Sequence, residues 1–422
     1  MKERYLLVVL IIFVFMLILD FYSFKGLKTI TFDFSNAQTR HTVHIIYWSI
    51  SVLFILLVPV FFFFSDYFVD PKNNSTAFLM NSVIFTYVLA KLTFVIFHGL
   101  DDILHLFRRI FEAVFQSSSS SDLPGSAITR LNFLTYFGAV AFALTASAFT
   151  YGIVKGRFNF RVIAEKLKFK NLPSKFNGFK VIQISDLHIG SFSRFHKSVK
   201  EIIEKINKLN PDLIVFTGDM VNNVADEMEG WQPIFSRLKA KHGKISILGN
   251  HDYGDYHTFP SAQAKIDNLK RLKEIHREIG FDLLLNENRT IKIDNEQISI
   301  LGVENWGKPP FVQYGDLDLA SKGTENAAFK LLLSHDPSHW DEQVKPNTNI
   351  DLTLSGHTHG MQFGIEIPGF KWSPVKYKYP KWAGLYSEGN QHLYVNRGFG
   401  HLGFAGRVGM DPEITEIELV SA

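Results

Sequence analysis

Four stretches of mostly apolar residues constrain this 422-residue chain more than any other feature. They cover residues 5–24, 45–64, 77–97 and 131–154. Each is about as long as the ~20 residues that a helix needs to cross a hydrocarbon core ~30 Å thick. Because lipid satisfies no backbone polar group, such segments must be helical inside it. The sequence therefore predicts a transmembrane region of four spans over residues 1–154, followed by a second domain over 155–422.

The composition agrees with this prediction. Hydrophobic residues make up 46% of the chain and aromatic residues 14%, with 40 Phe, and the mean hydropathy of +0.05 is high for a soluble protein with this charge content. The first stretch could instead be a signal peptide. Its apolar run is longer than the roughly 7 to 15 residues of a signal-peptide core, however, and no small-residue cleavage site follows. We therefore expect an uncleaved span.

Basic residues indicate the orientation of the spans. With four spans, both chain ends lie on the same side of the membrane. That side would carry Lys2, Arg4, Lys72, Lys155, Arg157, Arg161, Lys166, Lys168 and Lys170. The other side would carry Lys25, Lys28, Arg40, Arg108, Arg109 and Arg130. The positive-inside rule then favours a multi-pass protein of the cell (inner) membrane whose C-terminal half is cytoplasmic.

Two features of the apolar half are unusual. Residues 101–115 place apolar side chains at helical spacing among charged ones, which predicts a helix lying in the interface plane. Lys91 falls inside the third stretch, where a charge is costly. We expect it to pack against another span or to extend toward the interface, in preference to a transport role.

From residue 155 the pattern is that of a soluble domain. Strand-like runs at 179–184, 213–217, 244–248, 298–303, 329–334 and 352–354 alternate with helical patterns such as 198–209 and 262–279. This alternation predicts an α/β domain with sheet inside and helices outside.

Clusters of polar side chains follow five of those strands. They comprise Asp186 and His188, then Asp219, then Asn250, His251 and Asp252, then His335, and finally His357 and His359. Each cluster alone could be a turn, a helix cap or a buried histidine bonded to backbone. Together they indicate a site, since ligands gather at the carboxyl ends of strands in α/β sheets.

The residue types indicate divalent metal ions. The chain has no cysteine, which excludes disulfides and thiolate ligands. Carboxylate, amide and imidazole donors suit Mn, Fe, Zn or Mg, whereas calcium prefers more oxygen. The 44 basic and 41 acidic residues nearly balance, so no nucleic-acid partner is expected.

The ordered blocks D-x-H, G-D, G-N-H-D, a lone H and G-H-T-H resemble the calcineurin-like metallophosphoesterases from about residue 179 to the C-terminus. The match is closest to a membrane-associated bacterial branch, through residues 356–362, 397–400 and 411–415. Met361 and Asp411 depart from that branch's usual Gly and Pro. The resemblance implies a β-sandwich flanked by helices, with two divalent metal ions.

Residue by residue, the resemblance implies two metal positions. Asp186, His188 and His359 would hold one metal, Asn250, His335 and His357 the second, and Asp219 would bridge them. His251 would face the substrate phosphate as a general acid, oriented by a hydrogen bond that its ring donates to the Asp252 carboxylate. Hydroxide bridging the two metals would then attack the phosphorus, so no protein nucleophile is needed.

The expected substrate is a phosphoester or pyrophosphate. The wider family includes enzymes that cleave UDP-2,3-diacylglucosamine in lipid A biosynthesis, and a membrane-anchored domain would suit such a lipid-linked substrate. Residues 363–386 interleave aromatic residues with lysines, which suits either an interfacial surface or an ordinary aromatic-rich loop. The alternatives are a phosphodiesterase of nucleotides or other soluble diesters, a nuclease or phosphoprotein phosphatase, and a sensor or transporter of phosphate compounds. The sequence leaves the oligomeric state open.

Overall fold

The computed structural model describes every residue except 1, 33, 65–69, 71–72, 116–131 and 193–195. The chain divides into two compact units. The first unit contains residues 1–69 and 80–151, and the second contains residues 70–79 and 152–422.

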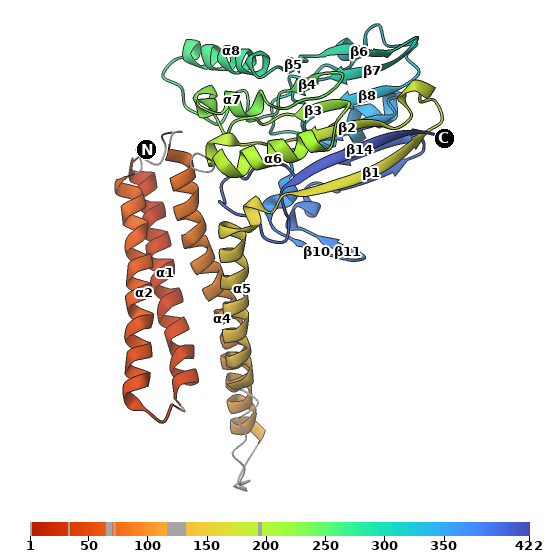
Figure 1. The fold of residues 1–422 in the computed structure, drawn as a ribbon. Helices are drawn as coiled ribbons and strands as arrows, with labels where there is room; N and C mark the ends of the chain where they lie inside the picture. Colours follow the sequence, from red (N-terminus) through yellow and green to blue (C-terminus); the bar gives the residue numbers. More distant parts are fainter. Residues whose placement is uncertain (1, 33, 65–69, 71–72, 116–131, 193–195) are drawn as a thin grey trace. The chain divides into compact units, whose positions relative to one another are not determined.

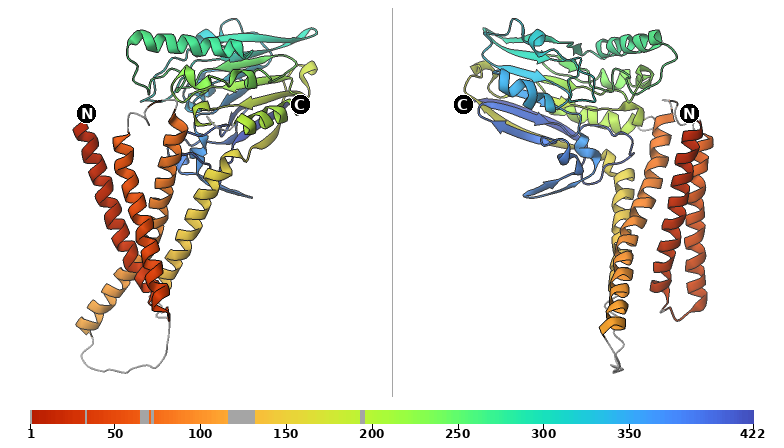
Figure 2. Two further views of the ribbon diagram at one scale, coloured as in Figure 1. Left: turned by 60° about the vertical axis from the view of Figure 1, so that its left-hand side comes forward. Right: turned by 180° about the vertical axis from the view of Figure 1, so that it is seen from behind.

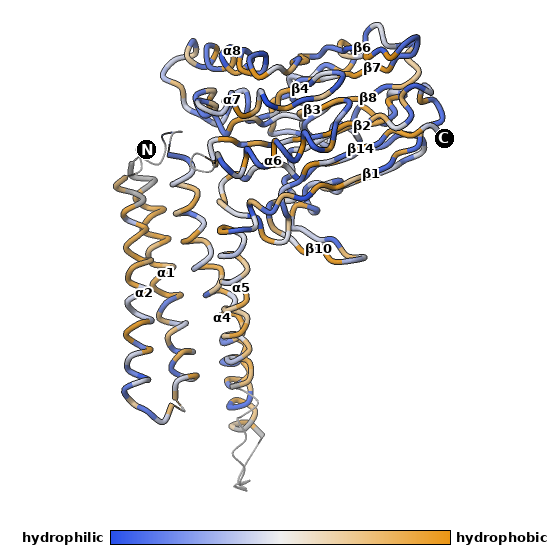
Figure 3. Tube along the Cα trace, in the orientation of Figure 1, coloured by the Kyte–Doolittle hydropathy of each residue, from blue (hydrophilic) through white to orange (hydrophobic). Residues whose placement is uncertain are grey.

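The first unit is built from long apolar helices (Figure 3). They are α1 (Lys2–Thr31), α2 (Ala37–Phe63), α4 (Asn74–Phe115) and α5 (Asn132–Val154), of which α4 begins and α5 ends in the second unit. Four helices in the described part of the chain are long and apolar enough to cross a membrane. The prediction of four spans is confirmed, although α1, α2 and α4 extend beyond the apolar stretches. Residue 131, the expected start of the fourth span, lies outside the described residues.

The prediction of a separate interfacial helix over residues 101–115 is wrong. Helix α4 continues through this segment without a break. Gly99 stands at the expected junction, but one glycine costs a helix only about 1 kcal/mol relative to alanine. That cost does not end a helix when favourable helical patterns lie on both sides.

The second unit contains two six-stranded mixed sheets (Figure 1). The first has the order β1 (Arg161–Phe169), β14 (Glu413–Ser421), β2 (Phe179–Ile184), β3 (Leu213–Thr217), β4 (Lys244–Ile247) and β5 (Asp282–Leu283). All neighbours are parallel except β14 and β2. Strands β2 and β3 have the predicted limits.

The second sheet has the order β12 (Gly384–Glu388), β13 (Gln391–Val395), β9 (Leu352–Ser355), β8 (Lys330–Leu333), β7 (Glu296–Gly302) and β6 (Glu287–Ile293). Its four central strands are parallel, and an antiparallel strand closes each edge. Buried aliphatic side chains of both sheets, such as Val215 and Leu331, form one core cluster. The two sheets therefore make a β-sandwich.

Helices cover the outer faces of the sandwich. The outer face of the first sheet packs against α6 (His196–Lys208), α7 (Gln232–Phe235) and α8 (Ala262–Glu278) through a second apolar cluster. Trp340 and Val344, in a short helical segment followed by α10 (Lys345–Asn347), pack with the outer face of the second sheet, beside α9 (Leu317–Ser321). The predicted fold class is confirmed.

Candidate metal centre

The predicted metal-ligating residues meet where strands of both sheets end. Asp186 and His188 follow β2, Asp219 follows β3 and Asn250 follows β4. His335 follows β8, and His357 and His359 follow β9. Parallel strands carry their carboxyl ends to one edge, and here two sheets contribute such an edge. The sandwich therefore brings together residues up to 173 positions apart.

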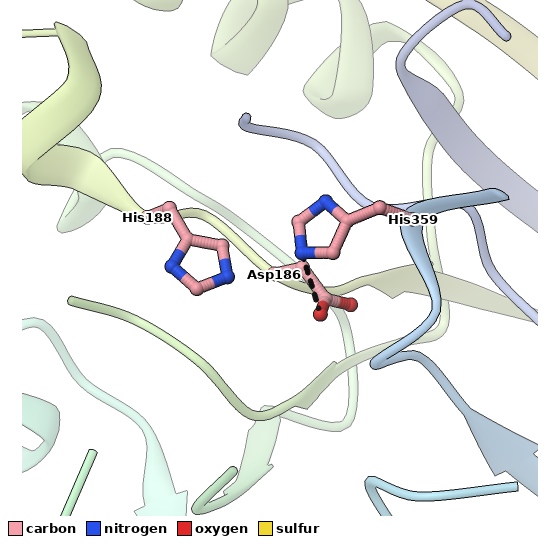
Figure 4. Close-up of side chains that lie close together, drawn as sticks. All are labelled: Asp186, His188 and His359. Atoms are coloured by element: carbon pink, nitrogen blue, oxygen red, sulfur yellow. Dashed lines mark ion pairs between the residues drawn. The ribbon is translucent and has the colours of Figure 1, made fainter. Parts of the chain in front are cut away.

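The first group consists of Asp186, His188 and His359 (Figure 4). One donor atom of each lies within 4.8 Å of the others, and all three side chains are buried. His359 Nε2 is 3.2 Å from Asp186 Oδ1. The same carboxylate accepts the backbone N–H of His357 at 3.0 and 3.1 Å, which fixes its orientation.

The second group consists of Asp219, His335 and His357, with Asn250 beside them. The Asn250 Oδ1 atom lies 2.8 Å from His357 Nδ1 and 3.1 Å from His335 Nε2. Its Nδ2 donates to the Tyr256 hydroxyl at 3.0 Å, so the amide oxygen is the atom that faces the group. His335 Nδ1 donates to the Thr217 carbonyl at 2.7 Å, which leaves Nε2 as the ligand atom.

Asp219 belongs to the second group and also lies beside the first. Its Oδ2 is 3.5 Å from His188 Nε2, in the first group, and 3.2 Å from His335 Nε2, in the second. Its Oδ1 accepts the backbone N–H of His251 at 2.8 Å. One carboxylate thus faces both groups, which is the position expected of a bridging ligand.

The backbone at these positions is strained. Positive φ angles between 44° and 70° occur at Asp186, His188, Asp219, His357 and His359. Each such angle in a residue other than glycine costs on the order of 1–3 kcal/mol, and such residues concentrate at functional sites. These backbone conformations turn the side chains toward one another shortly after each strand ends.

The electrostatics of the two groups favour a positive charge between the carboxylates of Asp186 and Asp219. Burial is the largest influence on His188 and lowers its pKa to about 4, although the Asp219 carboxylate acts in the opposite direction. Burial opposes the charged form of His335 as well, but the adjacent Asp219 carboxylate raises its pKa to about 10. Burial likewise works against ionised Asp219, yet the imidazoles of His335 and His251 hold its pKa well below the usual range.

Unsatisfied nitrogens show that a metal ion fits these residues. Both ring nitrogens of His188 and Nε2 of His359 are buried without a hydrogen-bond partner among the described residues. Buried polar atoms are normally paired, so orphaned imidazole nitrogens beside carboxylates match the donor set of a divalent cation.

The expected hydrogen bond between Asp252 and His251 is wrong. His251 Nδ1 donates to the Asn222 carbonyl at 2.7 Å. The Asp252 carboxylate instead accepts the backbone N–H groups of Gly249, Asp219 and Met220, each at 2.8 Å. Asp252 therefore fixes the two loops after β3 and β4, because these backbone donors stabilise its buried carboxylate.

Sequence reasoning missed three residues around the groups. Tyr256 holds Asn250, and its ring centroid is 4.7 Å from that of His251. The Tyr379 hydroxyl is hydrogen-bonded to His357 Nε2 at 2.8 Å, and Asp336 Oδ2 is 3.6 Å from the same nitrogen. Asp336 directly follows His335 and could have been noticed, whereas nothing local marks the two tyrosines.

The fold and the paired groups define a class: membrane-associated metallophosphoesterases. Residues 3–157 match the family model described as "Probable Calcineurin-like phosphoesterase, transmembrane domain", and residues 179–361 match "Calcineurin-like phosphoesterase". The chain belongs to the calcineurin-like phosphoesterase family. It is accordingly a phosphoester hydrolase that uses divalent metal ions.

Three curated relatives illustrate the family. The uncharacterized metallophosphoesterase YkuE of Bacillus subtilis is 32% identical over 304 residues, covering 70% of this chain and 98% of the relative. Phosphodiesterase YaeI of Escherichia coli is 27% identical over 298 residues, covering 69% and 100%. UDP-2,3-diacylglucosamine pyrophosphatase LpxG of Chlamydia trachomatis is 30% identical over 280 residues, covering 54% and 81%.

Proposed function

We propose that this enzyme is a membrane-anchored dimetal phosphohydrolase that cleaves a phosphoester or pyrophosphate of a lipid-linked substrate such as UDP-2,3-diacylglucosamine. The position of Asp219 between two buried ligand groups carries the dimetal part of the proposal. The four apolar helices and the similarity to LpxG support the lipid-linked part. In this proposal residues 1–154 anchor the enzyme and residues 155–422 form the catalytic domain.

The proposed ligands divide between two cations. Asp186, His188 and His359 hold one, Asn250, His335 and His357 hold the other, and Asp219 contacts both. Bound there, two divalent cations supply Lewis-acid stabilisation of the phosphoryl oxygens and lower the pKa of a bound water. The chain itself contributes the positioning, through Asp252, Tyr256 and the Thr217 carbonyl.

His251 is the proposed proton donor to the leaving oxygen. Its Nδ1 is occupied by the Asn222 carbonyl, so Nε2 is the ring atom left to hold a proton toward the substrate. The ring is partly exposed and lies beside His188, at a centroid separation of 4.9 Å. A group at the edge of the metal-ligating residues can reach a substrate atom without itself binding metal.

The proposed location of the catalytic domain is the cytoplasmic side of the cell membrane. The excess of Lys and Arg around the chain ends and after α5 supports this orientation. A nucleotide-linked lipid such as UDP-2,3-diacylglucosamine would then be reached from the cytoplasm.

A second candidate function is hydrolysis of soluble phosphodiesters. The similarity to phosphodiesterase YaeI over 69% of the chain favours it. Both candidates use the same metal-ligating residues, because these residues contact phosphate oxygens and not the attached groups. They differ in whether the lipid part of the substrate contributes to kcat/KM.

Turnover by the purified full chain tests the proposal. Bis-p-nitrophenyl phosphate, p-nitrophenyl phosphate and UDP-2,3-diacylglucosamine are compared with added Mn²⁺, for the wild type, Asp219→Ala and the surface control Asp318→Ala. We expect Mn²⁺-dependent turnover, highest kcat/KM for the lipid, and loss only in Asp219→Ala. Preference for bis-p-nitrophenyl phosphate would favour the second candidate, and no turnover by metal-loaded protein would contradict both.

A further inference from the structure

A small hairpin in the second unit stands apart from both sheets. Strands β10 (Ile365–Ile367) and β11 (Phe370–Trp372) pair only with each other, through a turn in which Gly369 has a φ of 79°. Two views show the hairpin extending beyond the sandwich (Figure 2). Isolated two-stranded hairpins are marginally stable in water, so this one requires support from its surroundings.

The outward face of the hairpin is apolar. Ile365 pairs with Trp372 and Ile367 with Phe370, so all four side chains lie on one face. Ile365, Ile367 and Phe370 are 49%, 57% and 51% exposed. Single exposed apolar side chains are ordinary, but a contiguous row on a projecting element indicates an interaction surface.

The charged side chains of the hairpin point the other way, into the domain. Glu366 accepts from both terminal nitrogens of Arg397, at 2.7 and 3.1 Å, and lies 3.5 Å from Arg161. Lys371 Nζ donates to the Ala383 carbonyl at 2.5 Å. A hairpin facing water would have the opposite arrangement, with its charged side chains outward.

Backbone hydrogen bonds connect the hairpin to the end of the fourth span. Gly364, directly before β10, donates to the Val408 carbonyl at 2.9 Å. The adjacent Arg407 donates its backbone N–H to the Gly152 carbonyl at 3.1 Å. Gly152 lies in the last turn of α5, so the base of the hairpin is held at the end of that helix, which is the fourth candidate span.

The hairpin also connects to the metal-ligating residues at both ends. It begins three residues after the 3₁₀ turn that opens with His359 (His359–Gln362). After β11, Ser373 Oγ donates to the Gly360 carbonyl at 2.8 Å, and Tyr379 is hydrogen-bonded to His357. Lys376, Tyr377 and Lys378 between them are exposed, a combination that suits anionic headgroups.

We infer that the apolar face of the β10–β11 hairpin inserts into the lipid bilayer that the four spans cross. The bilayer is the occupant because the hairpin is held at the end of a span, turns its charges inward and is followed by exposed lysines. Inserted, the hairpin brings the rim of the metal-ligating residues to the headgroup level. The consequence for a lipid-linked substrate rests on the proposed function, whereas insertion itself does not.

Fluorescence quenching tests insertion directly. Because the chain has no cysteine, Ile367→Cys carries one environment-sensitive fluorophore, and Ile266→Cys on α8, 60% exposed, is the matched control. The full chain is reconstituted into vesicles with and without spin-labelled phosphatidylcholine. We expect spin-labelled lipid to quench residue 367 at least about fivefold more than residue 266, since only lipid-embedded probes contact the label.

Equal quenching at residues 367 and 266 would overturn the inference. Protection of residue 367 from both spin-labelled lipid and aqueous iodide would also overturn it, because a second protein copy would then cover the hairpin. Quenching of residue 367 by lipid in a protein that does not hydrolyse UDP-2,3-diacylglucosamine would support insertion and contradict the proposed substrate only.

Substrate preference provides the second test. Ile367→Ser combined with Phe370→Ser is compared with Ile266→Ser. We expect the ratio of kcat/KM for UDP-2,3-diacylglucosamine to kcat/KM for bis-p-nitrophenyl phosphate to fall about tenfold in the hairpin variant, because two apolar side chains no longer enter lipid. The ratio for Ile266→Ser stays that of the wild type. Equal ratios in both variants, measured on folded protein, would overturn the consequence for a lipid-linked substrate, whereas insertion itself is decided by the quenching experiment.

Discussion

Helix α4 of the first unit buries the Lys91 ammonium beside the Asp20 carboxylate of α1, whereas the second unit buries the Asp186 and Asp219 carboxylates among imidazoles. Asp20 Oδ1 also accepts from Ser51 at 3.1 Å and Tyr87 at 2.7 Å. Lys91 further donates to Tyr47 at 2.9 Å. The network in the first unit thus contains both the anion, Asp20, and its cation, Lys91. The expectation that Lys91 packs against another span is confirmed, because Asp20 lies on α1.

The buried groups of the second unit lack this internal balance. His188 and His359 keep unsatisfied nitrogens, and the surrounding charge favours an added cation. The difference teaches that burial of charge does not by itself mark a functional site. A network with its own counter-ion holds helices together, whereas unpaired imidazole nitrogens gathered beside carboxylates mark a place for a cation.

Removing Asp219, the proposed bridging carboxylate, gives the largest expected effect. Asp219→Ala should lower kcat/KM for bis-p-nitrophenyl phosphate on the order of 10⁴-fold, about 5 kcal/mol of transition-state stabilisation, since both metals lose a ligand. Steady-state kinetics with saturating Mn²⁺ measure the loss. The Tm is measured beside the kinetics, because the variant also leaves His335 and the His251 backbone N–H without their buried partner. Retained turnover would remove Asp219 from the site.

Breaking the Lys91–Asp20 ion pair of the first unit should lower stability and leave turnover unchanged. Lys91→Met leaves Asp20 buried without its cation and should lower the free energy of unfolding by about 3 kcal/mol, while kcat below the Tm stays near that of the wild type. Thermal unfolding in detergent measures the first quantity. The double variant Asp20→Leu with Lys91→Met should recover most of the lost stability. Loss of kcat with an unchanged Tm would mean that the pair takes part in the reaction.

His276, a buried histidine outside the metal-ligating groups, should make the stability of the protein depend on pH. Burial lowers the pKa of His276 from 6.5 to about 3, and its Nδ1 is bonded to Ser246. Below pH 6.5 the unfolded chain binds a proton that the folded chain does not, so stability falls by about 2 kcal/mol by pH 5. The Tm of the wild type should drop more between pH 7.5 and pH 5 than that of His276→Gln. Equal decreases in Tm for the two proteins would contradict the low pKa of buried His276 as the cause.

Loss of the side chain that positions a proposed ligand of the second metal, Asn250, should give the smallest effect. Tyr256→Phe removes the hydroxyl that holds the Asn250 amide, and we expect about tenfold weaker Mn²⁺ binding at one of two sites. Calorimetric titration of metal-free protein measures both sites. Tyr314→Phe, which loses a bond to Asp255 instead, is the matched control. Identical affinities in the two variants would show that Tyr256 does not position Asn250.

Much of the site was predictable because its signals are local. Strands 179–184 and 213–217 are rich in apolar β-formers, and the polar residues that follow them stand at the same edge of two parallel strands. The apolar stretches similarly predicted α1, α2, α4 and α5, because length and hydropathy decide whether a helix can cross a membrane.

Other features depend on contacts between distant residues. Strand β14, at the end of the chain, lies between β1 and β2, and no pattern in 413–421 indicates those neighbours. The partner of His251 is a backbone carbonyl, at Asn222, which any residue type could supply. The inward-facing charges of the β10–β11 hairpin likewise depend on Arg161 and Arg397, far away in the sequence.

The metal content of the full chain tests the central claim most directly. Protein stripped with a chelator, dialysed against Mn²⁺ and freed of excess metal is analysed by mass spectrometry, beside Asp219→Ala and Asp20→Asn. We predict two Mn²⁺ per wild-type chain, two per Asp20→Asn chain, and fewer than one per Asp219→Ala chain. Equal metal content in wild type and Asp219→Ala would contradict the claim that the carboxylate-imidazole groups of the second unit hold the metals.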